Sequence, residues 1–322
     1  MKAVVLRRPC AANELKIEEV PVPDVKKGWV LVKVKAFGIN RSELFTRKGQ
    51  SPSVKLPRII GIECVGEVAD PADSHLATGQ RVVSMMGGLG RDFDGSYAEY
   101  ALIPKKQVYP VDSHIGWTQF AAMPEMYYTA WCSLTEALKL KKSDQLLIRG
   151  GTSSVGLAAC QIARAMGVTV AATTRKGDRA DLLRLHGADV VLTDDGTVEK
   201  QLKAEFPHGA NKVLELIGTK TMQSSFSMLR KGGTLCMSGI LGGEWSFKDF
   251  APMDFIPSGS YLTIYDSQIV NTQRLNAMFA FLEEHDIKPT ISKVFPLDDI
   301  AAAHSLMESN TADGKIVVTT QS

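Results

Sequence analysis

The residues that most directly indicate chemistry form a glycine and serine turn between an apolar segment and an amphipathic one, within residues 146–166. Gly150 and Gly151 allow the chain to leave a strand sharply, and Gly156 allows a helix to pack closely against that strand. The first turn of such a helix offers free backbone N–H groups and a partial positive charge. We therefore expect the turn to bind the pyrophosphate of a dinucleotide, and an ordinary serine-capped helix is the alternative. The residues expected to hold the pyrophosphate are Gly151, Ser153, Ser154, Val155 and Gly156.

Basic residues follow the next expected strand, at residues 168–173. A fold that prefers NAD places an acidic residue there for the ribose hydroxyls, but this chain has Thr174, Arg175 and Lys176. Arg175 lies 19 residues beyond Gly156 (175 minus 156), close to the usual offset of about 20. A guanidinium group favours a 2′-phosphate. The three residues predict NADPH as the cofactor, and a solvated basic turn without a ligand is the alternative.

Two later turns complete the expected cofactor site. The fourth and fifth strands of an alternating region are expected at residues 211–216 and 233–238. The turns that follow them lie at the carboxyl edge of a parallel sheet, where dinucleotides bind. The residues expected to contribute there are Ile217, Gly218, Ser238, Gly239 and Ile240.

The composition is typical of a soluble globular chain of two domains, with 322 residues, 44% hydrophobic and 22% charged. A formal charge of +2 gives no reason to expect nucleic acid or a membrane surface as a partner. No stretch reaches membrane-spanning length, and the N-terminus lacks the pattern of a signal peptide. The five cysteines are scattered without paired spacing, which argues against disulfides and fits a cytoplasmic location.

The order of expected elements predicts an α/β protein of two domains. Short alternating strands, among them residues 30–35, 61–68 and 95–104, indicate a β-rich first part. Strands and helices then alternate, which indicates a doubly wound parallel sheet. We assign residues 1–120 and 266–322 to the β-rich domain and residues 121–265 to the dinucleotide-binding domain.

Several local patterns in this order make the chain resemble the medium-chain dehydrogenase/reductase superfamily, and within it the zinc-independent quinone oxidoreductase branch that includes zeta-crystallin. The resemblance spans essentially the whole chain. The segments that carry it are residues 37–43, 60–68, 95–100, 128–131 and 314–318, together with the turn at 150–156. It implies a GroES-like catalytic domain, a Rossmann domain and a substrate cleft between them.

The resemblance also permits a direct test for zinc. Zinc-using relatives have a cysteine where this chain has Asn40 and a histidine where it has Ile62. An asparagine carbonyl is a poor ligand for zinc and isoleucine offers no lone pair. The loop at residues 86–95 has no cysteine, whereas relatives with structural zinc carry four there. The six histidines form no local ligand spacing. We therefore expect no metal.

The resemblance assigns further site residues. It places Asn40 near the nicotinamide ribose or a substrate oxygen, with a turn residue as the alternative, and Thr129 near the cofactor. Tyr128 is a candidate catalytic hydroxyl beside Tyr127, and packing is the alternative for both. Lys315 is expected to approach the cofactor, unless it merely opens an exposed strand. The roles of Arg41, Glu43 and Glu125 stay open. Glu125 is either a buried acid or exposed to solvent, and Phe45 stands where many relatives have a tyrosine.

These features predict an NADPH-dependent, zinc-independent oxidoreductase that transfers hydride to a quinone or an α,β-unsaturated carbonyl compound. Such acceptors are already polarised and need mainly positioning and a hydrogen bond to the developing oxyanion. An enoyl-thioester reductase is the enzymatic alternative. A non-catalytic NADPH-binding structural or regulatory protein is the other. Relatives commonly pair edge strands, so residues 260–265 predict a homodimer.

Overall fold

The computed structural model describes residues 1–266 and 270–320, which divide into two units. The first comprises the described residues within Met1–Glu125, Ser267–Ala277 and Lys288–Ser322, and the second comprises Met126–Asp266 and Met278–Ile287. The first unit thus includes residues 121–125, and the second includes residues 278–287. The expected boundaries at 120/121 and 265/266 stay a prediction. Residues 267–269 and 321–322 of the expected range 266–322 lie outside the described part.

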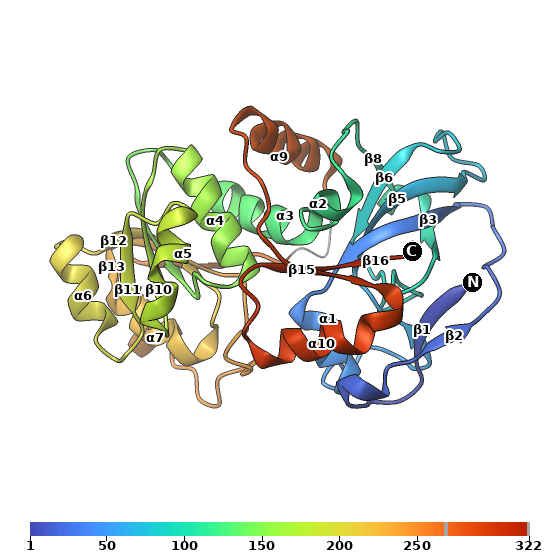
Figure 1. The fold of residues 1–322 in the computed structure, drawn as a ribbon. Helices are drawn as coiled ribbons and strands as arrows, with labels where there is room; N and C mark the ends of the chain where they lie inside the picture. Colours follow the sequence, from blue (N-terminus) through green and yellow to red (C-terminus); the bar gives the residue numbers. More distant parts are fainter. Residues whose placement is uncertain (267–269, 321–322) are drawn as a thin grey trace. The chain divides into compact units, whose positions relative to one another are not determined.

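The second unit is built on a parallel sheet of six strands, as the sequence predicted (Figure 1). The spatial order is β11-β10-β9-β12-β13-β14, the order of a doubly wound dinucleotide-binding fold. The strands are β9 (Gln145–Arg149), β10 (Thr169–Thr174), β11 (Val190–Thr193), β12 (Ala210–Glu215), β13 (Leu229–Met237) and β14 (Tyr261–Ile264). Strand β13 begins four residues before the expected residue 233, and its pairing with β12 shifts register between Ala210 and Lys212.

Helices connect these strands and pack on the sheet. They are α4 (Ser154–Ala165), α5 (Ala180–Leu185), α6 (Val198–Glu205), α7 (Thr219–Ser227) and the short α8 (Pro252–Phe255). Helix α4 contacts β9 and β10 because Leu157, Ala158 and Ile162 form a buried face. Helix α3 (Pro124–Cys132), which runs into a π-helical turn (Ser133–Ala137), and α9 (Thr272–Glu284) each contribute residues to both units.

The first unit is β-rich. Its larger sheet has the order β15-β16-β3-β5-β6-β8, with β7 also paired to β3, and a smaller sheet has the order β2-β1-β4. The strands of the larger sheet are β3 (Trp29–Gly38), β5 (Glu63–Asp70), β6 (Arg81–Met85), β7 (Tyr100–Pro104), β8 (Tyr109–Pro110), β15 (Ile291–Pro296) and β16 (Lys315–Thr319). Those of the smaller sheet are β1 (Lys2–Leu6), β2 (Ile17–Glu19) and β4 (Arg58–Ile59).

Helices α1 (Arg41–Arg47), α2 (Trp117–Ala121) and α10 (Ile300–Ser309) lie wholly within this unit. Helices α1 and α10 contact each other (Figure 1). The core of this unit is apolar and includes Val32, Phe37, Ile60, Tyr97 and Ile316, each almost fully buried. The GroES-like and Rossmann architectures that the sequence predicted are both present.

The expected strand at residues 95–104 is wrong in its first half. Only Tyr100–Pro104 forms a strand. The backbone N–H groups of Gly95, Ser96 and Tyr97 donate to the carbonyls of Ile59, Gly61 and Ile60, respectively. This segment therefore hydrogen-bonds to residues 59–61 instead of extending β7.

Candidate functional site

The glycine and serine turn of the second unit has the geometry of a phosphate-binding helix start. Ser153 is the N-cap of α4, and its hydroxyl accepts from the backbone N–H of Gly156 (3.1 Å) and donates to the carbonyl of Gly150 (2.8 Å). The hydroxyl of Ser153 is thus used to hold the turn. No hydrogen bond within residues 1–266 and 270–320 uses the backbone N–H groups of Ser154 and Val155. These two donors lie at the positive end of the helix dipole.

The glycines of this turn permit close approach. A Cβ atom on Gly156 would lie 2.5 Å from the carbonyl oxygen of Gly151 and 2.6 Å from that of Gly150. A Cβ atom on Gly151 would meet Ala172 Cβ at 3.0 Å. Helix α4 can therefore sit this close to the β9 turn only with glycine at 156, whereas a side chain at 151 would require its neighbours to shift slightly.

Two basic side chains leave the end of β10. Thr174 is buried, and its hydroxyl donates to the carbonyl of Lys176 (3.0 Å) and accepts from the Lys176 N–H (3.2 Å). This local turn holds the backbone while Arg175 and Lys176 are exposed. The pair is available to an anionic group beyond the carboxyl edge of the sheet.

A buried carboxylate that the sequence analysis missed organises the next turn. Glu215, at the end of β12, is fully buried, and its Oε1 accepts from the N–H groups of Ile217 (2.7 Å) and Gly218 (3.0 Å). Its Oε2 accepts from the hydroxyl of Ser225. The amides of Ile217 and Gly218 are therefore engaged within the protein, and their carbonyl oxygens accept from the N–H groups of Gly242 and Thr221, respectively, which leaves the half-buried side chain of Ile217 for a ligand. The signal for Glu215 in the sequence was a single acid at the end of an expected strand.

The last predicted turn of the second unit lies after β13. The hydroxyl of Ser238 is 2.8 Å from that of Ser133 and 3.3 Å from the Cys236 sulfur. Gly239 has no room for a side chain, because a Cβ atom would lie 2.4 Å from the Leu216 carbonyl oxygen. Ile240 follows it and is half-buried. The turns after β12 and β13 are thus packed against each other.

The tyrosines of α3 are buried. The Tyr127 hydroxyl donates to Gln161 Oε1 on α4 (2.6 Å), which assigns Tyr127 to packing within the second unit. Tyr128 is also fully buried and lies beside Tyr265, whose pKa is raised by burial and by its neighbours Cys132 and Tyr128. Thr129 is 5% exposed.

In the first unit, Asn40, Glu63 and Lys315 form a closed buried cluster. Asn40 is the N-cap of α1 but makes no side-chain cap hydrogen bond. Its Nδ2 instead donates to Glu63 Oε1 (2.8 Å), and its Oδ1 accepts from Lys315 Nζ (2.5 Å). Lys315 Nζ also lies 2.7 Å from Glu63 Oε1. The exposed-strand alternative for Lys315 is wrong, because its side chain is 0% exposed.

The charges around Lys315 set its protonation. Burial by itself lowers the pKa of Lys315, but the neighbouring carboxylates of Glu63, Glu125 and Glu43 outweigh it, and the net pKa is raised. Lys315 is therefore a buried ammonium ion. Sequence reasoning missed Glu63, although a single acid within the buried run 60–66 requires a partner of opposite charge.

A second acid, Glu43, lies in the same interior. It is 1% exposed, accepts from the Ile62 N–H (3.2 Å) and from the Ser42 hydroxyl (2.9 Å), and has a pKa raised to about 7, mainly by burial.

The remaining candidates of this unit lie around that cluster. The backbone N–H of Glu125 donates to Glu63 Oε2 (2.9 Å), and Glu125 is half-buried, between the two alternatives of a buried acid and solvent exposure. Arg41 donates to Asn310 Oδ1 (2.7 Å) on the surface of the unit. Phe45 is half-buried on α1.

The residues at the zinc-ligand positions of relatives do not fit zinc. Ile62 has no donor atom, and the one suitable atom of Asn40 is engaged by an ammonium ion, which would repel a metal cation. Within residues 1–266 and 270–320, no group of three or more His, Cys, Asp or Glu side chains is placed to hold a metal ion.

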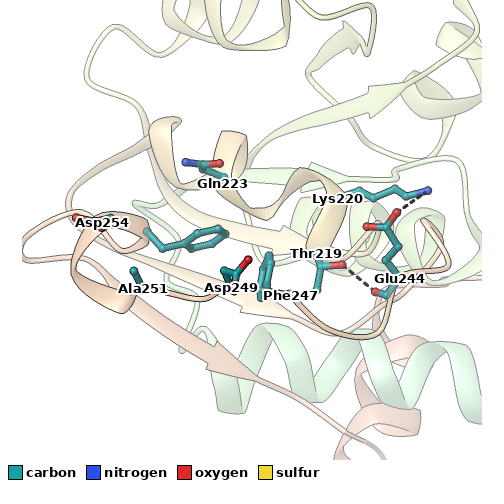
Figure 2. Close-up of a pocket in the computed structure, with 9 residues that line it drawn as sticks. Thr219, Lys220, Gln223, Glu244, Phe247, Asp249, Ala251 and Asp254 are labelled. Atoms are coloured by element: carbon teal, nitrogen blue, oxygen red, sulfur yellow. Dashed lines mark hydrogen bonds and ion pairs between the residues drawn. The ribbon is translucent and has the colours of Figure 1, made fainter.

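The second unit has a hollow of about 520 Å³ between α7 and the segment at 244–255. Figure 2 shows the residues that line it. Lys220 pairs with Glu244 (3.3 Å) at one end, and Phe247 and Phe255 contribute its apolar wall. None of the predicted cofactor residues lines it. Helices of the described residues are all too short or too polar to cross a membrane.

Family models match both units. Residues 26–113 match the alcohol dehydrogenase GroES-like domain, and residues 154–284 match the zinc-binding dehydrogenase family.

Two similar proteins cover much of the chain. Quinone oxidoreductase from Sus scrofa is 28% identical over 311 residues, which cover 93% of this chain and 92% of the relative. A zinc-type alcohol dehydrogenase-like protein from Schizosaccharomyces pombe is 34% identical over 244 residues, covering 73% and 69%, respectively.

Two solved structures match over nearly their full length. An NAD-dependent alcohol dehydrogenase has a TM-score of 0.89 at 26% identity and covers 100% of both chains. A mycobacterial protein complexed with NADPH has a TM-score of 0.88 at 26% identity and covers 99% of each. The first of these proteins is thus NAD-dependent, and the second binds NADPH.

Proposed function

Because the chain belongs to the medium-chain dehydrogenase/reductase superfamily, in its zinc-independent quinone oxidoreductase branch, we propose that it reduces quinones or α,β-unsaturated carbonyl compounds with NADPH. Oxidoreductase relatives along nearly the whole chain support an enzyme that uses a nicotinamide cofactor. The acceptor class and the choice of NADPH are the parts that need experiment.

The observation that carries the acceptor class is the cluster around Asn40. Where zinc-using relatives have a metal ligand, this chain has an amide held by a buried ammonium and a buried carboxylate. An amide N–H stabilises an oxyanion less than a metal ion does, so it suits an acceptor that is already electron-poor. Quinones and enones meet this requirement, since hydride reaches a ring or β-carbon while negative charge develops on oxygen.

The cofactor proposal depends on the second unit. The free amides of Ser154 and Val155 would hold the pyrophosphate, and the exposed Arg175 and Lys176 would hold a 2′-phosphate. The remaining residues proposed for the NADPH site are Asn40, Thr129, Gly151, Ser153, Gly156, Thr174, Ile217, Gly218, Ser238, Gly239 and Ile240, together with Lys315, whose buried ammonium would act on the cofactor through Asn40. When bound, NADPH supplies the hydride. Tyr128 remains a candidate hydroxyl whose buried position favours packing.

The proposal extends to assembly and location. Strand β14 is the edge of the six-stranded sheet, and its Tyr261 and Ile264 are 62% and 65% exposed. An exposed apolar edge strand supports a homodimer. Five unpaired cysteines support a reducing cytoplasm.

The experiment is a set of initial rates for NADPH and NADH with a small quinone, an enone and an enoyl thioester. We expect turnover with NADPH and the quinone or enone. A preference for the thioester would show that the acceptor is an enoyl thioester and not a quinone or enone. Tight NADPH binding without oxidation by any acceptor would contradict the catalytic proposal.

A further inference from the structure

Lys315 lies where it can act on a reaction without touching a substrate. Its side chain is 0% exposed, and its ammonium contacts Asn40 and Glu63. Asn40 is 8% exposed, so it is the member of the cluster that has some access to solvent. An effect of Lys315 on bound molecules must therefore pass through Asn40.

The chemistry of the partners fixes which way the Asn40 amide points. An ammonium group can only donate, so it must face Oδ1, and a carboxylate can only accept, so Glu63 must face Nδ2. Flipping the amide would place Nδ2 against Lys315 and Oδ1 against Glu63, which is two repulsive contacts. The acceptor atom of Asn40, Oδ1, is therefore already bonded to Lys315. Of its two N–H bonds, one points to Glu63, and no hydrogen bond within the described part of the chain uses the other.

The surroundings make this orientation rigid. Glu63 Oε2 is anchored by the Glu125 backbone N–H, and Gly38 leaves space for the lysine. A Cβ atom on Gly38 would lie 2.2 Å from Lys315 Cε and 2.5 Å from Glu63 Oε1. The cluster thus joins the ends of β3, β5 and β16 with the start of α1.

We propose that Lys315 is a positioning residue that keeps Asn40 a hydrogen-bond donor only, with its free N–H available to the oxyanion that forms on the acceptor. The ammonium also withdraws electrons from the amide, which strengthens that donor. This inference rests on the proposed function, because it concerns the same reduction.

The test separates the charge of Lys315 from its effect on folding. Lys315→Met alone leaves Glu63 buried without its cation, so we compare Glu63→Gln, in which Glu125 and Glu43 still act on the ammonium, with the double variant Lys315→Met/Glu63→Gln. A glutamine can still accept from Asn40 through its amide oxygen. We expect the double variant to lose about 10- to 100-fold in kcat relative to Glu63→Gln, with KM for NADPH changed less than threefold.

A matched control is the Lys35–Glu67 pair, which joins β3 and β5 in the same sheet at 3.0 Å. We expect Lys35→Met to leave kcat within about twofold of the wild type. Asn40→Ala is then made with and without Lys315→Met, both in the Glu63→Gln background. If Lys315 acts through Asn40, removing the lysine has little further effect once Asn40 is absent. If the kcat losses of Asn40→Ala and Lys315→Met instead multiply, Lys315 acts independently of Asn40 and the positioning role is overturned.

A readout that needs no turnover completes the test. The side-chain amide signal of Asn40, identified by its loss in Asn40→Ala, is followed by ¹⁵N NMR. We expect it to shift between Glu63→Gln and the double variant but not in Lys35→Met. An unchanged signal would overturn the inference even if the wild type reduces quinones. A shifted signal in a protein that reduces no acceptor would instead support the positioning and overturn the proposed function.

Discussion

At the scale of single residues, burial decides what the acids of the first unit can do. Glu43 is enclosed, and its folded-state pKa of about 7 lies above the ordinary value of 4.5. Between these values the folded protein binds a proton that the unfolded chain releases. The free energy of unfolding therefore decreases as pH rises from about 4.5 through 7.

Glu43→Gln should remove this penalty. The free energy of unfolding of the variant minus that of the wild type should be larger at pH 8 than at pH 5, by on the order of 3 kcal/mol. Urea denaturation at the two pH values measures the difference. Glu205→Gln, at an exposed position, serves as the control for replacing a surface glutamate. Equal stability differences at both pH values would contradict the raised pKa.

Arg175 carries the cofactor preference. We expect Arg175→Glu to weaken NADPH binding about 10- to 100-fold, because a charge-assisted hydrogen bond to phosphate is lost and a repulsion is gained. NADH binding should change little. The control is Arg184→Glu, whose side chain is 58% exposed on α5 and pairs with Asp181. Fluorescence titration gives both affinities, and an NADPH affinity unaffected by Arg175→Glu would refute the assignment.

At the scale of elements, the β9–α4 turn depends on glycine, which has no Cβ atom. Gly156→Ala would place a Cβ atom 2.5 Å from a backbone oxygen, so the helix start must move. We predict a loss of about 1–3 kcal/mol in stability and a weaker cofactor affinity. Gly116→Ala is the matched control, because nothing lies within 4 Å of the added atom. Thermal unfolding with and without NADPH compares them, and equal behaviour would count against the close-approach argument.

The separation along the chain between interacting residues explains what the sequence could predict. The turn, its strand and its helix are contiguous, so Gly150 to Gly156 identify a phosphate-binding element by local pattern. Lys315 lies 275 residues from Asn40, and no local spacing connects them. Sequence placed Lys315 correctly at the start of a strand but could not supply its partners. The expected strand at 95–99 failed for a similar reason, because the N–H groups of residues 95–97 donate to the distant residues 59–61.

At the scale of the whole molecule, assembly depends on the edge of the second unit's sheet. We expect the wild type to form a dimer through β14, and Ile264→Lys to shift it to monomer, since a charge would be buried at the interface. Leu185→Lys, at a residue that is 82% exposed on α5, should leave the dimer intact. Light scattering at several concentrations decides this. A wild-type monomer at all concentrations would remove the dimer proposal.

The wide separation of Asn40 and Lys315 along the chain also governs the order of events during synthesis. Asn40 and Glu63 leave the ribosome before the whole parallel sheet of the second unit, and Lys315 leaves after it. Until then, Glu63 has no buried cation to neutralise it, so the first unit cannot close around that carboxylate. The second unit is nearly continuous in sequence and can fold in the meantime. The nascent protein would therefore acquire its nucleotide-binding half first and its Asn40 cluster last.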